Sequence, residues 1–320
     1  ILIIGDFFMK IRFGYACITE TLDITTSSTY TYSEYLKTKD LEKLDRVISS
    51  NLNNLEEVIN YNIKNNIHFY RMSSKLIPLA TKEDVKFDYL EKYKDKFKQI
   101  GNIIKKNNLR LDFHPDQFCV LNSTNKETVN NSIEILKYHY NILDALGINE
   151  KVMVLHVGSN VFGKTKALER FIKNFKELPL NIRNSIVVEN DDKIFTIEDC
   201  IYLHEKLGIP IVLDYHHFMC NHTDSNIEKY LDIIFSSWKN INPKIHFSSP
   251  KNKTKKEMRS HHDYIDASSF LEFLKIIKNY NYDIDIMIEA KKKDEAMFRL
   301  IRYLKYKTNF KVIDDTTFEI

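Results

Sequence analysis

Cysteine and long apolar segments are scarce in this sequence of 320 residues. The four cysteines, Cys17, Cys119, Cys200 and Cys220, form no CxxC motif and have no paired spacing. We therefore expect a reduced, cytoplasmic protein without a disulfide framework. No apolar stretch approaches the roughly 20 residues that are needed to cross a bilayer, so no membrane association is expected.

Charge of one sign is also lacking, because 47 Lys and Arg residues nearly cancel 44 Asp and Glu residues and leave a net charge of +3. This balance gives no global sign of nucleic-acid binding, but it leaves room for a local basic groove. Glycine occurs only seven times, and neither a GxGxxG motif nor a Walker phosphate loop is present. The sequence thus gives no support for a nucleotide cofactor or for a doubly wound open sheet.

What the sequence does contain is a regular alternation of strand and helix patterns. Short apolar runs predict eight strands, at residues 10–15, 67–72, 109–114, 151–156, 186–189, 211–214, 244–248 and 285–289. Helical spacing of apolar residues predicts helices at 40–65, 89–106, 126–146, 164–178, 196–207, 226–235, 268–279 and 294–306. No linker interrupts the series, so we predict an α/β protein with a single TIM (β/α)8 barrel over residues 10–310. Residues 1–9 are expected to be an N-terminal extension, and residues 311–320 a C-terminal tail.

Six of the predicted strands carry, at or near their carboxyl ends, residue types that bind metal ions. These residues are His114, His156, Glu189, Asp214, His246 and Glu289. The carboxyl ends of parallel barrel strands share one face, so the six side chains are expected to converge there. A single histidine at a strand end is more often a hydrogen-bonded structural residue, but that explanation would have to be repeated for every position.

A polynuclear centre of imidazole and carboxylate ligands is the simpler hypothesis, and zinc or manganese suits such ligands. Two or more divalent ions can activate water near neutral pH and stabilise both the attacking and the leaving oxygen. We therefore predict a metal-dependent hydrolase with Glu189 as the central ligand. The ligand pattern alone leaves a metal-dependent isomerase open.

Eight short motifs occur in a fixed order along the chain. They are RFGY at 12–15, FHPDQF at 113–118, HVG at 156–158, ENDD at 189–192, DYHH at 214–217, HFSS at 246–249, HHDY at 261–264 and EAKKKD at 289–294. Each motif alone is weak, whereas eight in this order are specific. From about residue 10 to residue 299, the chain resembles the UV damage endonuclease family, which is related to abasic-site nucleases of the endonuclease IV type.

The resemblance implies a centre of three divalent metal ions, with manganese favoured and zinc or magnesium as alternatives. His114, His156 and Glu189 would bind one ion. Glu189 would also bridge to a second ion, and it is assigned a catalytic role for this reason. The further ligands implied for the second ion are Asp214, His246 and Glu289.

The resemblance also implies a third ion and a modified lysine. His217 and His261 would bind the third ion, and His261 is preferred to His262 because the family pattern is His-x-Asp-Tyr. Lys244 shares a strand face with His246, since side chains alternate along a strand. The matching lysine of the family can be carboxylated, so we predict a catalytic role for Lys244.

The lesion-recognition residues implied by the resemblance are both aromatic and basic. Gln117 and Phe118 match a Gln-Tyr pair that the family inserts into the duplex opposite the damage, and Phe118 retains the stacking surface without the hydroxyl. Tyr15 matches a tyrosine near the damaged nucleotides. Packing at the rim of the barrel is the ordinary alternative for both aromatic residues. The basic residues expected to contact phosphates are Lys251, Lys253, Arg259 and Lys291.

The implied function is a DNA repair endonuclease that nicks damaged duplex DNA immediately 5′ of pyrimidine dimers and 6-4 photoproducts. Abasic sites would be a second class of substrate. Metal-activated hydroxide would attack the phosphodiester. Damaged double-stranded DNA is the expected partner, without an obligate protein partner, and the expected location is the bacterial cytoplasm, with nucleoid association when the protein is on DNA.

Three other functions are weaker alternatives. A metal-dependent sugar isomerase or epimerase on a related barrel shares the strand-end ligands. It leaves Gln117, Phe118 and the basic loop after the seventh strand (Lys251, Lys253, Lys255, Lys256 and Arg259) without a purpose. A DNA-binding protein without catalysis leaves the filled ligand positions unexplained. An amidohydrolase is disfavoured because its first strand would carry an HxH motif, whereas this strand ends Gly14-Tyr15-Ala16.

Overall fold

The computed structural model describes residues 8–252, 254 and 257–320. These residues form two compact units. Unit 1 contains the described chain up to Tyr15, Asn65–Phe69 and Val188–Ile320, and unit 2 contains Ala16–Lys64 and Tyr70–Val187. Three of the unit boundaries fall inside strands, one each in β1, β2 and β5.

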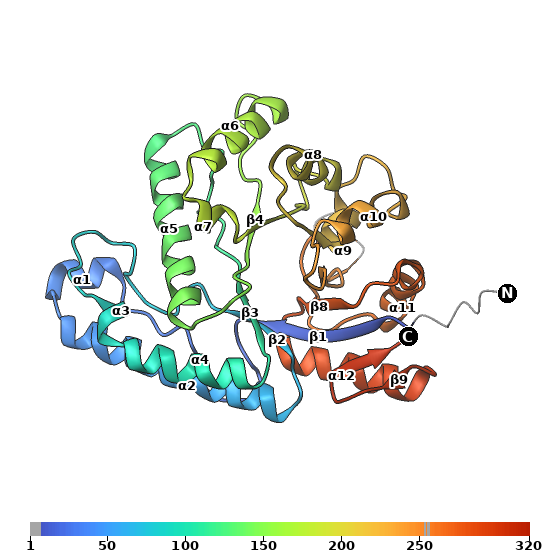
Figure 1. The fold of residues 1–320 in the computed structure, drawn as a ribbon, viewed down its shortest axis with the longest axis horizontal. Coiled ribbons are helices and arrows are strands. Elements are labelled where there is room, and N and C mark those ends of the chain that lie inside the picture. The colour runs from blue at the N-terminus through green and yellow to red at the C-terminus, as the bar shows by residue number, and fades with distance from the viewer. Residues whose placement is uncertain (1–7, 253, 255–256) are drawn as a thin grey trace. The chain divides into compact units, whose positions relative to one another are not determined.

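Strands and helices alternate along the described chain (Figure 1). The strands are β1 (Lys10–Ala16), β2 (Phe69–Met72), β3 (Arg110–Phe113), β4 (Met153–His156), β5 (Ile186–Glu189), β6 (Ile211–Asp214), β7 (Lys244–Phe247), β8 (Ile284–Ile288), β9 (Lys311–Val312) and β10 (Thr317–Glu319). The helices are α1 (Tyr32–Thr38), α2 (Leu41–Lys64), α3 (Tyr89–Lys92), α4 (Lys94–Lys106), α5 (Lys126–Ala145), α6 (Lys164–Glu177), α7 (Leu180–Arg183), α8 (Ile197–Leu207), α9 (Tyr215–Cys220), α10 (Glu228–Ser236), α11 (Ala267–Ile277), η1 (Lys278–Tyr280) and α12 (Lys293–Lys307).

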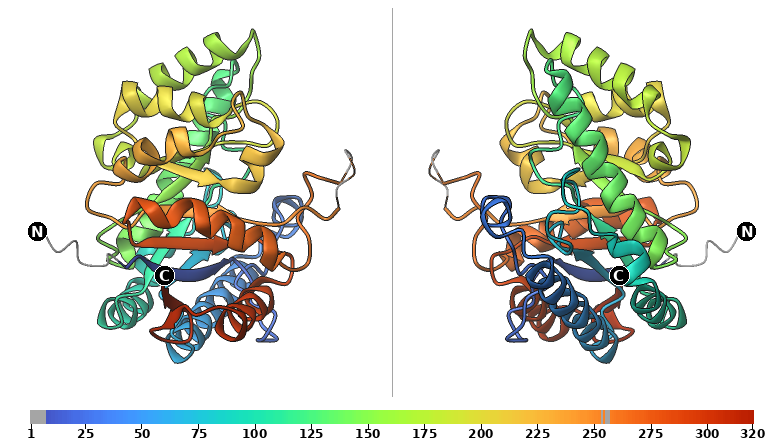
Figure 2. Two further views of the ribbon diagram at one scale, coloured as in Figure 1. Left: turned by 90° about the vertical axis from the view of Figure 1, so that its right-hand side faces the viewer. Right: turned by 90° about the vertical axis from the view of Figure 1, so that its left-hand side faces the viewer.

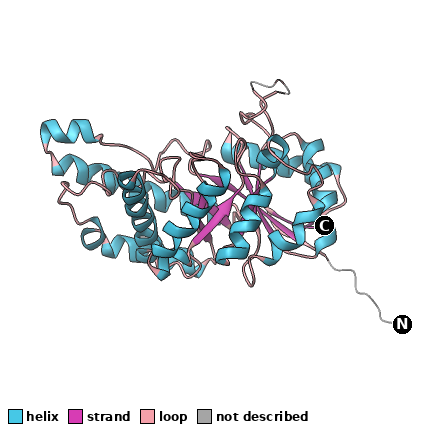
Figure 3. Ribbon diagram, turned by 90° about the horizontal axis from the view of Figure 1, so that it is seen from above, coloured by secondary structure: helices cyan, strands magenta, loops and turns pink. Residues whose placement is uncertain are grey.

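The fold class is that of a TIM (β/α)8 barrel, as predicted. Strands β1 to β8 alternate with helices, and the pairings among them within each unit are parallel. Inside each unit the helices lie outside the strands (Figure 3). No helix in the described part of the chain is long and apolar enough to span a membrane.

In unit 1, strands β5, β6, β7 and β8 are neighbours in the sheet, and four of the predicted strand-end residues lie on or directly after them. Asp214 lies opposite His246 across β6 and β7. Lys244 lies opposite Asp285 across β7 and β8. All residues of β6, β7 and β8 are buried, because helices such as α10 and α12 cover these strands (Figures 1 and 2).

The two ends of the described chain meet at the edge of the sheet in unit 1. β10 pairs antiparallel with β1, and β9 pairs with β10. Met9 is buried, and its backbone exchanges hydrogen bonds with Ile320. The sequence predicted a tail at residues 311–320, and these two short strands, of two and three residues, were not among the predicted elements. The proposed domain limits stay a prediction.

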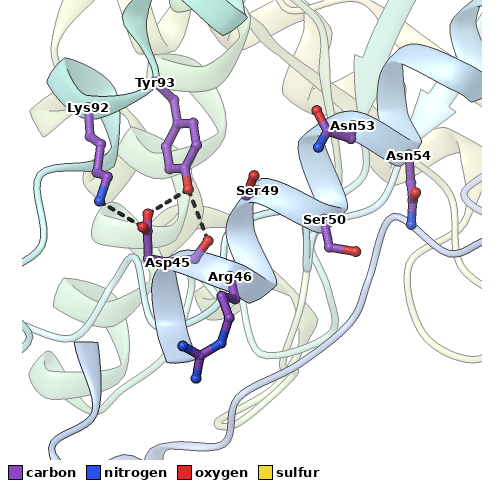
Figure 4. Close-up of a pocket in the computed structure, with 8 residues that line it drawn as sticks. All are labelled: Asp45, Arg46, Ser49, Ser50, Asn53, Asn54, Lys92 and Tyr93. Carbon is purple, nitrogen blue, oxygen red and sulfur yellow. Dashed lines mark hydrogen bonds and ion pairs between the residues drawn. The ribbon is translucent and has the colours of Figure 1, made fainter. Parts of the chain in front are cut away.

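In unit 2, helices α2 and α4 lie side by side, and α5 packs against α4 and α7 (Figures 1 and 2). One helix was predicted over residues 89–106, but it is divided at Tyr93 into α3 and α4. The Tyr93 hydroxyl donates to the carboxylate of Asp45 at 2.6 Å, and Lys92 lies 2.8 Å from the same carboxylate. These contacts line a polar groove of 630 Å³ beside α2 (Figure 4), and they join α3 to α2.

Candidate metal centre and nucleic-acid contacts

Five polar side chains converge at the carboxyl ends of the strands in unit 1. Glu189 ends β5, Asp214 ends β6, His246 lies on β7, Glu289 follows β8, and His217 lies on α9. They form two groups that share Glu189, one with Asp214 and His217 and one with His246 and Glu289. The ligand atoms within each group lie within 4.8 Å of one another. Each group is therefore compact enough to bind one divalent ion.

The distances within the cluster place Glu189 at its centre. Glu189 Oε1 lies 2.6 Å from His246 Nδ1 and 3.9 Å from His217 Nδ1. His246 Nδ1 is also 3.3 Å from Glu289 Oε1, and His217 Nδ1 is 3.6 Å from Asp214 Oδ2. The sequence predicted a bridging role for Glu189, and this geometry is consistent with that role.

The burial of these carboxylates indicates that the cluster suits a cation. The side chains of Glu189 and Asp214 are at most 1% exposed. Burial raises the pKa of Asp214 to about 7, and the nearby charges of Glu189 and Glu289 add to the rise while His217 opposes it. Asp214 Oδ2 is buried and accepts no hydrogen bond from the described residues. Carboxylates gathered away from water are costly unless a cation balances them, so oxygen and imidazole donors here fit a divalent ion.

A short helix that the sequence did not predict places His217. The Asp214 carboxylate is the N-cap of α9 and accepts the backbone N–H of His217 at 2.7 Å. An Asp-x-x-His sequence directly after a strand was the available signal, because aspartate is a preferred N-cap whose side chain bonds to the third helical residue. The capping interaction therefore brings both predicted ligands to the same side of the strand end.

Asn190 is a buried residue that sequence reasoning missed. Its side chain donates to the Asp214 carbonyl at 3.0 Å and accepts the Asp214 N–H at 2.9 Å. Its own carbonyl lies 3.0 Å from His217 Nδ1. A carbonyl only accepts, so Nδ1 of His217 carries the proton and Nε2 is the nitrogen suited to an ion. Asn190 thus orients two of the predicted ligands.

His216 has a structural role, unlike its neighbour His217. Its Nε2 lies 2.6 Å from the carbonyl of Met258 and its Nδ1 lies 2.6 Å from the hydroxyl of Ser248. The carbonyl must accept, so Nε2 donates and Nδ1 accepts from the hydroxyl. Burial lowers the pKa of His216 to about 4, which keeps the imidazole neutral. His216 therefore joins the segment after β7, which contains Ser248 and Met258, to the helix that follows β6.

The structure separates the two adjacent histidines of the HHDY motif. The ring of His261 is partly buried and lies 6.4 Å from the ring of His217, and burial lowers its pKa. His262 is exposed, and its Nδ1 accepts the backbone N–H of Tyr264 at 2.9 Å. His261 belongs to neither of the two ligand groups described above, so its role as a metal ligand stays a prediction.

We expect His261→Gln to lower the bound metal content and to slow nicking about 10-fold to 100-fold, since an imidazole donor is lost. His262→Gln is the matched control and is expected to behave like the wild type. Metal analysis and nicking rates measured side by side test the pair. A larger loss in the His262 variant than in the His261 variant would reverse the assignment.

In unit 2, the two remaining predicted ligands face one another. The rings of His114, after β3, and His156, at the end of β4, lie 5.1 Å apart. The carbonyl of His114 accepts the hydroxyl of Ser74 at 3.0 Å. Gly158 has a φ of +109°, and a Cβ there would lie 2.7 Å from Asn122 Oδ1. Only glycine fits this close approach of the two loops, which accounts for the glycine of the HVG motif.

The predicted lesion-contacting residues differ in exposure. Phe118 is 69% exposed and Gln117 is exposed, as a wedge requires. Asp116 accepts the backbone N–H of Phe118 at 2.9 Å and shapes the turn that presents the ring. Tyr15, in unit 1, is fully buried. Its ring is therefore not presented at the surface, and its predicted contact with damaged nucleotides stays a prediction.

The segment that follows Phe118 is held to two helices of unit 2. The hydroxyl of Ser132, on α5, accepts the backbone N–H of Val120 at 2.8 Å. The amide of Asn174, on α6, donates to the carbonyl of Leu121 at 2.6 Å. The exposed ring therefore lies close to a fixed backbone.

The predicted phosphate contacts are partly balanced by carboxylates. Lys251 lies 2.5 Å from Glu257, Arg259 lies 3.7 Å from Asp192, and Lys291 lies 3.9 Å from Asp263. Lys253 lies outside the described residues. If Lys251, Arg259 and Lys291 bound phosphates, these ion pairs would be broken. The cost would be small, because exposed ion pairs contribute little to stability.

Lys244 is fully buried on β7, two residues before His246 and on the same strand face. Its neighbour across the strands, Asp285, accepts two hydrogen bonds from the Arg12 guanidinium, at 2.6 and 2.8 Å. Lys244 thus lies opposite a buried carboxylate, on the strand that also carries His246.

The charge of the cluster predicts how stability depends on pH. Burial lowers the pKa of His217, but the carboxylates of Asp214, Glu189 and Glu289 outweigh burial and raise it to about 9. The folded state then holds a proton that the unfolded state releases near pH 6.5. The contribution of this proton to the free energy of unfolding is therefore fully present below pH 6.5 and is lost as the pH rises through 9. The raised pKa of Asp214 acts in the same direction up to about pH 7.

We therefore expect the free energy of unfolding of the chelator-treated protein to fall between pH 7 and pH 9, by up to about 1.4 kcal/mol per pH unit for one proton. This window excludes His216 and His139, whose pKa values burial lowers to about 4 and which act in the opposite direction below pH 6.5. Denaturant unfolding at three pH values measures the slope. The variant His217→Gln should lose it, and a slope that is unchanged in this variant would contradict the assignment. Excess manganese should reduce the fall, because ion binding displaces the proton and strengthens as pH rises.

The fold and the cluster together define a class, namely TIM-barrel enzymes with a candidate metal centre at the strand ends. The sequence profile of the family described as UV-endonuclease UvdE matches residues 11–319. The chain belongs to this family, and it is accordingly an endonuclease that acts in DNA repair.

Individual relatives and solved structures agree with this assignment. The chain is 41% identical over 300 residues to a UV DNA damage endonuclease of Bacillus cereus (strain B4264), covering 92% of this chain and 94% of that one. It is 39% identical over 318 residues to that of Bacillus mycoides (strain KBAB4), covering 97% and 100%. The crystal structure of SacUVDE matches with a TM-score of 0.85 and 34% identity over 92% of this chain and 98% of that one.

More distant structures share the fold alone. Endonuclease IV from Thermus thermophilus matches with a TM-score of 0.56 at 13% identity, covering 92% of this chain and 99% of that one. An L-ribulose 3-epimerase matches with a TM-score of 0.51 at 14% identity, covering 88% and 81%. These two likenesses show the barrel and carry no evidence on the reaction.

Proposed function

We propose that this endonuclease nicks damaged duplex DNA immediately 5′ of pyrimidine dimers and 6-4 photoproducts, and also at abasic sites. The observation that carries the proposal is the buried cluster in which Glu189 serves two groups of donors, in a chain of the UV-endonuclease family. Hydrolysis of a phosphodiester develops charge on every oxygen around phosphorus. A centre that binds two or more cations side by side is suited to that charge.

Three divalent ions, manganese foremost, are proposed for the site, with zinc or magnesium as alternatives. Divalent ions at such a site lower the pKa of an attacking water and balance the charge on the scissile phosphate. Glu189, Asp214, His246 and Glu289 would bind in unit 1, and His217 and His261 would serve the third ion. The resemblance further assigns His114 and His156 to the ion next to Glu189.

Lys244 is proposed to act as a carboxylated lysine. Its position on the strand face of His246 supports this, because a carbamate there would add an anionic donor beside the imidazole and carboxylate donors. Protein incubated with 13C-bicarbonate should show a carbamate carbon signal that Lys244→Arg lacks. An identical spectrum from the two proteins would remove the modification from the proposal.

Damaged double-stranded DNA is the proposed partner. Gln117 and Phe118 would insert opposite the lesion, where an apolar ring can replace lost base stacking. Lys251, Arg259 and Lys291 would contact phosphates, together with Lys253.

The deciding experiment is a nicking assay on a labelled duplex with one defined pyrimidine dimer, in manganese, beside an undamaged duplex. Cleavage immediately 5′ of the dimer, and none of the control duplex, supports the proposal. A protein that contains metal but leaves dimer and abasic duplexes intact would refute it. Ketose and aldose substrates would then test the sugar epimerase alternative, which shares the fold but gives the exposed Phe118 no role.

A further inference from the structure

Two exposed apolar residues lie at the tip of the turn that follows β4. Val161 is 44% exposed and Phe162 is 74% exposed. The N–H of Gly163 donates to the carbonyl of Asn160 at 2.8 Å and closes a four-residue turn. Phe162 is the third residue of this turn and has a φ of +64°.

The position is unusual for phenylalanine. A positive φ at the third position of a turn favours glycine or asparagine, and a bulky side chain is strained there. The ring of Phe162 also remains in water, where its apolar surface gains nothing from burial. Strain together with exposure points to a role outside the fold of the free protein.

Hydrogen bonds join this turn to the segment that carries Phe118. Arg170, on α6, donates to the carbonyl of Val161 at 2.6 Å and to the carbonyl of Asn122 at 2.8 Å. The side chain of Asn122 accepts the N–H of Ser159 at 2.8 Å and donates to its carbonyl at 2.7 Å. The two exposed phenylalanines are thus held on two loops that are fastened to one another.

We propose that Val161 and Phe162 form a second apolar contact to the damaged duplex, beside the wedge of Gln117 and Phe118. This inference rests on the proposed function. Proteins that hold bent DNA commonly place apolar side chains against base steps and sugars, so a second tip next to a wedge fits such a duplex.

The charge next to the turn agrees with DNA as the occupant. Lys164 and Lys166 follow directly, and the first turn of α6 contains no acidic residue. An apolar tip flanked by lysines matches bases or sugars flanked by phosphates. The loop also begins at His156, a predicted ligand, as the wedge segment begins at His114.

The test compares Phe162→Ala with Tyr306→Ala, a control that removes a ring of 77% exposure from α12. Single-turnover nicking at increasing enzyme concentration separates half-saturation from the plateau rate. We expect Phe162→Ala to raise the half-saturation concentration about 10-fold with the plateau rate changed less than about 2-fold, since base stacking on an aromatic ring is lost. Phe162→Leu should lie between Phe162→Ala and the wild type, and Tyr306→Ala should match the wild type.

A second readout does not depend on cleavage. A fluorescent adenine analogue placed at successive positions around the lesion should show one position where the emission change on binding is smaller in the Phe162→Ala variant. Equal half-saturation and equal emission in the variant and the wild type would overturn the proposal, as would a lowered thermal midpoint that accounts for the loss. Self-association of the wild type that Phe162→Ala abolishes, with unchanged DNA binding, would replace DNA by a second copy of the chain.

The outcome can be separated from that of the proposed function. A wild type that binds damaged duplex through Phe162 without cutting it refutes the nicking activity alone. A wild type that nicks 5′ of the dimer with no contribution from Phe162 refutes this contact alone.

Discussion

Replacing Glu189 with glutamine is expected to lower nicking of a dimer-containing duplex by about 10³-fold or more. The amide that replaces the carboxylate is neutral, so it cannot balance two cations as the shared ligand of both donor groups. Cations that stabilise the phosphate lower the activation barrier by several kcal/mol, and each change of about 1.4 kcal/mol changes the rate about tenfold. Nicking rates and bound manganese, measured on the same preparations, test the expectation.

The matched control is Glu205→Gln, which changes an exposed glutamate of α8 in the same unit. The control should nick like the wild type. Manganese should raise the thermal midpoint of both the wild type and the control, because a bound ion stabilises the folded state, and this gain should be small in Glu189→Gln. A Glu189 variant that keeps both its metal content and its nicking rate would exclude Glu189 as the bridging ligand.

The double variant Gln117→Ala/Phe118→Ala is expected to lose about 100-fold of its nicking rate at a dimer under subsaturating conditions. The ring and the amide that would occupy the disturbed base step are then absent, and stacking on an aromatic ring accounts for roughly 1–3 kcal/mol per base. Phe118 is exposed, so the free energy of unfolding should change by less than about 0.5 kcal/mol. Nicking of damaged and undamaged duplexes, together with denaturant unfolding, measures both effects.

Leu180→Ala serves as the control, because it removes an apolar side chain of 63% exposure from the same unit. Phe118→Tyr restores the residue of the family pattern and should retain at least the wild-type rate. A double variant that still distinguishes damaged from undamaged DNA as well as the wild type would show that the lesion is recognised elsewhere.

The sequence predicted the fold because its pattern is locally consistent. Eight short apolar runs separated by helical periods admit few arrangements other than a barrel, and strand ends place their last side chains on one face. The identity of the strand-end residues then indicated ligands, and Glu189, Asp214, His246 and Glu289 do lie together in unit 1. The residues that were easy to predict are therefore those whose position follows from the strand alone.

The details that were missed depend on contacts between residues distant in the chain. His216 and His217 are adjacent and chemically alike, and only the contacts with Met258 and Asn190 distinguish the structural histidine from the predicted ligand. Strands β9 and β10 are too short and polar to show a period. Tyr15 is buried by packing that a strand pattern does not reveal.

The division of a predicted helix at Tyr93 has the same origin. No sequence signal ends a helix near Tyr93, since residues 89–106 contain no proline and their one glycine, Gly101, lies inside α4. The break is associated with the bond from the Tyr93 hydroxyl to Asp45, on α2. A tertiary contact of this kind overrides local propensity.

The hydrogen bonds from Ser132 and Asn174 to the backbone near Phe118 have a consequence for the range of substrates. Because this segment is anchored, the DNA would supply most of the adjustment on binding, and the energy required would depend on how easily the duplex is unstacked and kinked. Lesions of unrelated chemistry weaken the duplex in this same mechanical sense. An anchored Gln117-Phe118 segment would therefore rank substrates by the local flexibility of the DNA duplex. Duplexes with bulges or mismatches, although free of chemical damage, would be cut in proportion to how easily they bend.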